Sequence, residues 1–175
     1  MRFKENRALA WILVVIAVIA SVLISGHVSL SLQRRAVMNS FYETMDADLN
    51  TKSAYADNLA GVASRYLDRN SEYITNMAQA RDMLLNAKTP AEKYAASVKI
   101  TNAAAALYDI LGTMSLNETD ERLRRSNYAD IIAVDDILKR TSFNKNVDTF
   151  NSQLAMFPAN VIASITGIDK AEYFR

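Results

Sequence analysis

The sequence predicts an all-α protein with a single N-terminal transmembrane helix followed by an antiparallel up-and-down bundle of long helices. Three observations predict this fold class. The stretch from Ala8 to Gly26 has no charged residue, and its centre consists mainly of Ile, Leu, Val and Ala. Beyond it, apolar residues return at alternating intervals of three and four, which is the helical period. Only two prolines and four glycines interrupt the 175 residues.

The charge-free stretch is long enough to cross a bilayer. Roughly 20 apolar residues cross about 30 Å of hydrocarbon, so we expect a transmembrane helix over residues 8–30, after a short N-terminal end, residues 1–7. A cleaved signal peptide is the alternative, because three basic residues precede the run. Signal peptides, however, have apolar runs of about 7 to 15 residues followed by an A-x-A site. The longer run and the missing site favour a retained anchor.

Basic residues flank the expected span unequally. Arg2, Lys4 and Arg7 precede it, whereas Arg34 and Arg35 are the basic residues that follow closely. Because basic residues concentrate on the cytoplasmic side, the short N-terminal end is expected inside. The sequence thus predicts a single-pass protein of the cell membrane with an extracytoplasmic bundle.

Small residues recur every four positions on one face of the expected span. Ala17, Ser21 and Ser25 would let two backbones approach closely, with serine hydroxyls able to bond across. We therefore expect membrane helix packing at this face, and a homo-oligomer is one form of assembly that it favours.

The bundle is expected over residues 34–175 and to begin with one continuous helix over residues 34–87. This stretch contains one glycine and no proline, and its apolar positions form one heptad seam of coiled-coil type. Lys52 and Asn70 interrupt the seam. Its members are Met38, Tyr42, Met45, Leu49, Ala56, Leu59, Ala63, Tyr66, Tyr73, Met77, Ala80 and Leu84. Seam residues are expected in the core, and a binding stripe at its tyrosines is the alternative.

Local signals divide the rest of the chain. Thr89-Pro90-Ala91-Glu92 has the pattern of a capping box with proline at the first helical position, which predicts a helix over residues 90–114. Asn117 is a predicted N-cap, and the next helix is expected over residues 118–156. A short C-terminal helix, 158–166, follows Pro158. Apolar residues near the C-terminus are expected to cover the bundle; they are Phe157, Val161, Ile162, Ile165, Tyr173 and Phe174.

The C-terminal third carries a set of motifs whose order and spacing are specific. Residues 143–151 contain two aromatic-Asn pairs, residues 157–163 begin with Phe-Pro, and Gly167-Ile168 precedes Tyr173-Phe174. In these features the chain resembles the LemA family, although Ile168 stands where that family has Phe. The motif residues are Phe143, Asn144, Val147, Phe150, Asn151, Phe157, Pro158, Tyr173 and Phe174.

The resemblance implies a bacterial single-span membrane protein with an antiparallel helical bundle, in a family without an established activity. Two departures from the family pattern stand out. Asp57 occupies a position that is usually Pro, which implies a straighter long helix here. Residues 134–140 replace a stretch that usually contains Glu-Asn-Arg, which leaves any polar feature of that stretch unsupported.

Residue types exclude several chemistries. The net charge is +1, so no basic surface is expected to attract nucleic acid. The chain has no cysteine, and its one histidine, His27, lies at the edge of the expected span as an interfacial polar residue. The bundle therefore lacks the residues for Ser-His-Asp or Cys-His catalysis and for Glu-x-x-His di-iron sites. We predict no catalytic residue, no metal and no cofactor.

Carboxylates are the remaining candidates for acid and base catalysis. The candidate groups are Glu43, Asp46 and Asp48, or Asp135 and Asp136. Such pairs can act as acid and base, but their spacing favours a solvated helix face.

The predicted function is therefore non-enzymatic. We expect a membrane-anchored helical-bundle scaffold or adaptor for protein interactions at the bacterial envelope. Its expected partners are the lipid bilayer and a protein not identified by the sequence. The alternative is a ligand-sensing extracytoplasmic helical bundle, against which stand the single span and an N-terminal end too short for an output module.

Overall fold

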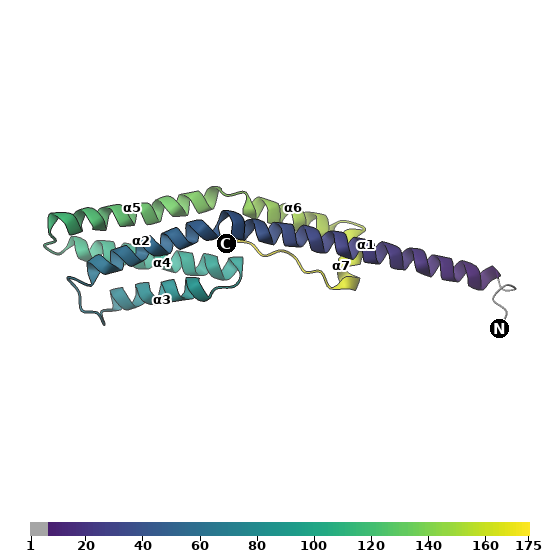
Figure 1. Ribbon diagram of the computed structural model, residues 1–175, viewed down its shortest axis with the longest axis horizontal. Coiled ribbons are helices and arrows are strands. Elements are labelled where there is room, and N and C mark those ends of the chain that lie inside the picture. The colour runs from purple at the N-terminus through teal and green to yellow at the C-terminus, as the bar shows by residue number, and fades with distance from the viewer. Residues whose placement is uncertain (1–6) are drawn as a thin grey trace. The chain divides into compact units, whose positions relative to one another are not determined.

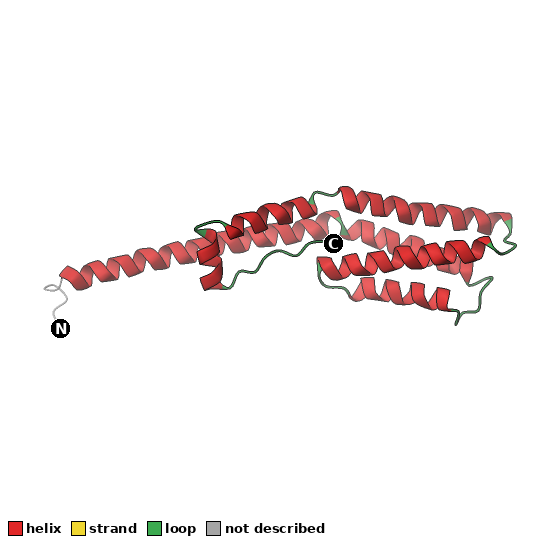
Figure 2. Ribbon diagram, turned by 180° about the vertical axis from the view of Figure 1, so that it is seen from behind, coloured by secondary structure: helices red, strands yellow, loops and turns green. Residues whose placement is uncertain are grey.

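The computed structural model describes residues 7–175, and in this part of the chain the fold is all-α, without strands. Figure 2 shows helices joined by loops throughout. Arg2 and Lys4, used above for orientation, lie outside the described residues. The helices are α1 (Arg7–Thr44), α2 (Asp46–Ala63), α3 (Glu72–Asn86), α4 (Pro90–Gly112), α5 (Glu118–Arg140), α6 (Phe143–Ala155) and α7 (Ala159–Thr166).

The chain divides into two compact units. The first comprises the chain up to Met38 together with Lys145–Ala171, and the second comprises Asn39–Asn144 together with Glu172–Arg175. The second unit is the helical bundle, in which α2 packs on α5 and α4, and α3 packs on α4. Its core contains most of the predicted seam: Met45, Leu49, Ala56, Leu59, Ala63, Met77, Ala80 and Leu84 are all buried.

The prediction of one helix over residues 34–87 is wrong. A helix already running from Arg7 passes residue 34, is interrupted only at Met45, and ends at Ala63, after which α3 returns alongside α2. The reversal occupies residues 64–71, where the Asp68 carboxylate accepts the backbone N–H of Asn70 at 2.7 Å. Asp and Asn favour turns because their side chains bond to nearby backbone groups. Asn70, an interruption of the seam, thus marks a turn.

The capping signals lie where the sequence places them. Thr89 Oγ1 accepts the N–H of Glu92 and the Glu92 carboxylate accepts the N–H of Thr89, which completes a capping box at the start of α4. Asn117 Oδ1 accepts the N–H of Asp120 at the start of α5. These bonds satisfy amides that have no partner within the helix.

The prediction of one helix over residues 118–156 is also wrong, because the helix is interrupted at residues 141–142. The backbone of Thr141 is extended, and its hydroxyl donates to the Leu138 carbonyl at 3.0 Å. A threonine side chain that bonds to the backbone in this way competes with helix continuation. Phe143, Val147, Phe150 and Leu154 alternate at intervals of four and three in the sequence, and all four are buried.

In the first unit, α7 lies against α1. Gly26 permits the approach: a Cβ added there would lie 2.5 Å from Ile162 Cδ1. Farther along, Arg34 Nε donates to the Asp169 carbonyl at 3.0 Å. Val37 of α1 and Phe150 of α6 line one shallow hollow, so α6 and α1 are neighbours in this unit as well.

The expectation that the apolar C-terminal residues cover the bundle holds for Phe174, which is buried in the bundle unit. Ile162 is buried against α1 in the first unit, and Phe157, Val161 and Ile165 are exposed. Phe157 lies three residues after Leu154 and so continues the four-three spacing of the buried residues of α6 in the sequence. The helix ends at Ala155, two residues before it, and Phe157 then faces solvent.

Candidate functional site

The N-terminal part of α1 is long and apolar enough to cross a membrane, and this stretch is not buried in the protein. Ala17, Ser21 and Ser25 are exposed on it. The Ser21 hydroxyl donates to the Ala17 carbonyl and the Ser25 hydroxyl to the Ser21 carbonyl, each at 2.8 Å. The hydroxyls are thus bonded within their own helix, and any close packing at this face depends on the small size of the residues.

His27 is half-buried in the protein. Its Nδ1 atom is buried and has no hydrogen-bond partner among the described residues. In that same part of the chain, no group of three or more His, Asp or Glu side chains could hold a metal ion.

Lys52, one of the two interruptions of the seam, is the centre of a buried polar cluster in the bundle. Its side chain is fully buried on α2 and forms an ion pair with Asp135 of α5. Its Nζ also donates to the carbonyl and hydroxyl of Ser97, at 2.9 and 2.8 Å, and to Thr101 Oγ1 at 2.7 Å, both on α4. One ammonium group therefore joins three helices, and its donors are all used.

Asp135 does not lie on a solvated face, which corrects the interpretation from its spacing. Its side chain is 18% exposed, and its second oxygen accepts a hydrogen bond from Thr101 Oγ1 at 2.6 Å. Asp136 does face solvent and pairs with Lys139 at 3.3 Å. The two adjacent carboxylates point apart, so they do not form an acid and base pair.

The other carboxylate candidates are also dispersed. Asp46 accepts from Lys93 Nζ at 2.7 Å, which joins α2 to α4. Glu43 is exposed near the end of α1. The spacing of Glu43, Asp46 and Asp48 favoured a solvated helix face, with acid and base catalysis as the other possibility. Asp46 is instead engaged in an ion pair between two helices.

A second buried cluster lies at the other end of the bundle helices. Asp120 is 1% exposed and accepts hydrogen bonds from Arg65, from the Tyr66 hydroxyl at 2.7 Å and from Asn117 Nδ2 at 2.8 Å. Tyr66 was predicted from its seam position to be a core residue, with a binding stripe as the alternative. Its hydroxyl instead joins the loop after α2 to the start of α5.

The aromatic-Asn pairs hold the C-terminal segment. Asn144 Nδ2 donates to the Phe174 carbonyl and its Oδ1 accepts the Phe174 N–H, both at 2.9 Å. Asn151 makes the same two bonds with Ala171, at 3.0 and 2.8 Å. Each asparagine side chain thus makes with one residue of the C-terminal segment the two backbone hydrogen bonds that a neighbouring β-strand would otherwise make.

The aromatic members of the motif have different environments. In the bundle unit, Phe143 packs edge-on against Phe41, with ring centroids 5.1 Å apart, and Phe174 lies between Phe41 and Tyr94 at 5.7 and 5.3 Å. Phe157 and Pro158 lie exposed in the turn before α7, and Tyr173 is half-buried. The motif therefore combines buried aromatic residues, an exposed turn, and the two asparagines that bind the C-terminal segment, Asn144 and Asn151, called the asparagine clamps below.

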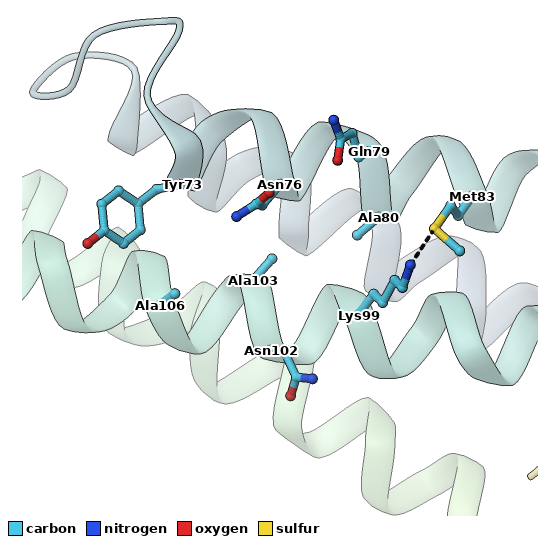
Figure 3. A pocket seen from close by; sticks show the side chains of 9 residues that line it. All are labelled: Tyr73, Asn76, Gln79, Ala80, Met83, Lys99, Asn102, Ala103 and Ala106. Carbon is cyan, nitrogen blue, oxygen red and sulfur yellow. Dashed lines mark hydrogen bonds between the residues drawn. The ribbon is translucent and has the colours of Figure 1, made fainter.

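Several hollows open on the bundle surface. One of them lies between α3 and α4 and has a volume of about 340 Å³. Figure 3 shows its lining: alanines form the floor, and Tyr73, Asn76, Met83 and Lys99 stand around it, with Lys99 Nζ 3.2 Å from Met83 Sδ. A second, of about 350 Å³, is lined from α4, α5 and the C-terminus by residues that include Val98, Asp135, Leu138 and Phe174.

Sequence reasoning found the motif residues but missed the function of Lys52 and Asp120. The signal was present for Lys52, because a charged residue inside an apolar seam must find partners when the seam is buried. For Asp120 there was no such signal, since an acidic residue in the first turn of a helix is common at the surface.

Comparison with known proteins agrees with the motifs. No curated protein matches the chain at a significant level. The sequence model of the LemA family matches residues 42–175, which include the Lys52 cluster, both asparagine clamps and the exposed Phe-Pro turn. The chain therefore belongs to the LemA family.

Proposed function

We propose that this LemA protein is a membrane-anchored helical-bundle scaffold that holds a protein partner at the bacterial envelope and has no catalytic activity. The observation that carries the proposal is helix α1. After Arg7 this helix has an exposed stretch free of charged residues. The same helix continues to Thr44 and contains Phe41, which packs against Phe143 in the bundle unit. A stretch of this kind is stable in lipid, and α1 would fasten the bundle to the bilayer.

The buried polar groups support a structural function. The ammonium of Lys52 and the carboxylate of Asp120 are each bonded to side chains from other parts of the bundle. Groups that are fully hydrogen-bonded in this way stabilise the packing of helices.

The hollow between α3 and α4 is the surface that we expect to hold the partner. Ala80, Ala103 and Ala106 line it, and small side chains let the backbone of another helix approach. Met83 and Leu85 of α3 are exposed nearby in sequence. An amphipathic helix of another envelope protein is the occupant that fits an alanine floor with a polar rim.

Orientation can be tested on the full-length protein because the chain has no cysteine. We expect a Leu85→Cys variant, with the new thiol on an exposed position of α3, to react with a membrane-impermeant maleimide in intact cells. Lysed cells provide the matched control for reactivity. Labelling only after lysis would mean that the bundle is cytoplasmic.

Partner binding can be tested by photo-crosslinking in native membranes. A photoreactive phenylalanine at Tyr73, in the α3–α4 hollow, is expected to crosslink to a protein of defined size, whereas the same group at the exposed Ile137 of α5 is not. A product the size of two chains would identify the scaffold as a homo-oligomer. Equal crosslinking at the two positions, or none at either, would contradict the proposal.

The second hollow favours ligand sensing as an alternative function. It combines apolar walls, Val98 and Leu138, with the partly exposed carboxylate of Asp135. Pockets of a few hundred Å³ with few polar groups are typical of small-molecule sites. A small molecule that remains on the purified full-length protein in native mass spectrometry would favour this alternative.

A further inference from the structure

The turn after α6 and the outer face of α7 expose four large apolar side chains. Met156, Phe157, Val161 and Ile165 are 64, 82, 45 and 62% exposed. Val161 and Ile165 are one helical turn apart and lie on the same face of α7. The opposite face of α7 is already buried through Ile162 and Ala163. The helix is thus apolar on two sides, and nothing in the described protein covers the outer one.

The position of α7 along α1 gives the depth of this surface. Ile162 lies against Gly26, and Gly26 is the last residue of the apolar stretch that starts at Ala8. From Ala8 to Gly26 the helix rises roughly 28 Å, close to the 30 Å or so of bilayer hydrocarbon. If α1 spans the membrane, its contact with α7 lies where the hydrocarbon ends.

The distribution of charge agrees with that depth. No Asp, Glu, Lys or Arg occurs between Asp148 and Asp169, and none occurs on α1 between Arg7 and Arg34. The first charged residues after these two runs meet, because Arg34 Nε donates to the backbone carbonyl of Asp169 at 3.0 Å. Both runs therefore end at one level of the first unit, as expected if that level is the edge of the membrane interface.

We propose that the turn at Phe157 and the outer face of α7 insert into the headgroup and acyl boundary of the bilayer that α1 crosses. The protein then contacts the membrane twice, through one spanning helix and one helix lying in the plane of the interface. Helices with an apolar face toward the acyl chains bind the interface in this way, and Trp, Phe and Leu are typical of that face. The inference rests on the membrane anchoring proposed above.

The test places a fluorescent probe at single cysteines of the full-length protein in vesicles of phosphatidylethanolamine and phosphatidylglycerol. Phe157→Cys and Ile165→Cys provide the test positions. Both side chains are exposed, so we expect the fold to be retained and the thiols to be labelled. Each probe is quenched in turn by nitroxide-labelled lipid and by aqueous iodide. We expect strong quenching by the lipid nitroxide, and several-fold weaker quenching by iodide than at a solvated position.

Two control variants separate this inference from the anchoring itself. Val18→Cys reports the exposed centre of the α1 stretch, and Leu85→Cys reports the surface of α3. Lipid quenching at Val18 with iodide quenching at Phe157 and Ile165 would overturn the interfacial helix and leave the anchor intact. Absence of lipid quenching at Val18 would overturn the anchor, and the interfacial helix with it.

Discussion

Asp135→Asn is expected to lower the free energy of unfolding by about 3–5 kcal/mol, the usual loss when one partner of a buried ion pair is removed. The substitution keeps the size of the side chain but removes the charge opposite Lys52, whose side chain is fully buried. The ammonium then has only neutral acceptors, namely the oxygens of Ser97 and Thr101 and the amide oxygen of the new side chain, and its charge is uncompensated. Thermal unfolding of the full-length protein in nanodiscs, followed by circular dichroism, should show a melting temperature lower by about 10 °C.

Asp136→Asn is the matched control for this change. Asp136 is the adjacent residue, is 54% exposed and pairs with a Lys139 side chain that is 74% exposed. Surface ion pairs of this kind contribute about 0–1 kcal/mol, so the melting temperature should hardly move. Equal shifts for the two variants would show that the cluster around Lys52 does not stabilise the bundle.

Asp135→Asn should also alter the pH dependence of stability. Burial lowers the pKa of Lys52 from its usual value of 10.5, whereas the hydrogen bond and the charge of Asp135 raise it. Between the lowered pKa and 10.5 the unfolded chain binds more protons than the folded one, so stability rises with pH in that window. Asp135→Asn removes both influences that raise the pKa. Its stability should therefore rise more steeply with alkaline pH than that of the wild type.

How much of this cluster was predictable depends on which residue is considered. The heptad period located Lys52 as a charged residue in a buried seam, and that location is correct. Its partner Asp135 is 83 residues away in the chain, and the period of one helix carries no information on which residue of another helix will face it. Packing and loop lengths determine how far α2, α4 and α5 are shifted along their axes relative to one another, and local sequence patterns do not encode that shift.

The long helix predicted over residues 34–87 failed for a related reason. Ala63 ends α2 and Met77 is buried in α3, and the interval between them is two heptads. A seam therefore keeps its phase across the turn at residues 64–71, and a hairpin of two short helices has the same apolar period as one long helix. Only Asn70, together with Asp68, offered a local signal for the reversal.

The asparagine clamps illustrate the opposite case. Their residues were found as a motif, but the motif alone did not show what an amide every seven residues binds. The tail segment, residues 168–175, has no helical or alternating pattern that would predict its extended course. Its conformation follows from the two amides that bind it, and such long-range bonds become visible only in the folded protein.

Asn151→Ala is expected to release the C-terminal segment. The substitution leaves the N–H and the carbonyl of Ala171 without their partners, and Ala171 is 3% exposed. Each buried backbone group left unpaired costs about 1–3 kcal/mol, so we expect a local loss of about 2–4 kcal/mol. Because the segment can detach without unfolding the bundle, the loss should appear as local opening. Hydrogen exchange at the Ala171 amide should accelerate on the order of 100-fold, since each 1.4 kcal/mol is tenfold.

Two variants decide whether this effect comes from the paired bonds. Asn146→Ala removes an exposed asparagine from the same helix α6 and should leave exchange at Ala171 unchanged. Asn151→Asp keeps the acceptor for the Ala171 N–H but places a carboxylate against the Ala171 carbonyl, which repels it while ionised. Protonation at acid pH supplies a donor again, so exchange in this variant should slow relative to Asn151→Ala as the pH is lowered. Exchange that is equally fast in the alanine and aspartate variants at every pH would show that the tail is held by the apolar contacts of its neighbours, and not by the two hydrogen bonds of Asn151.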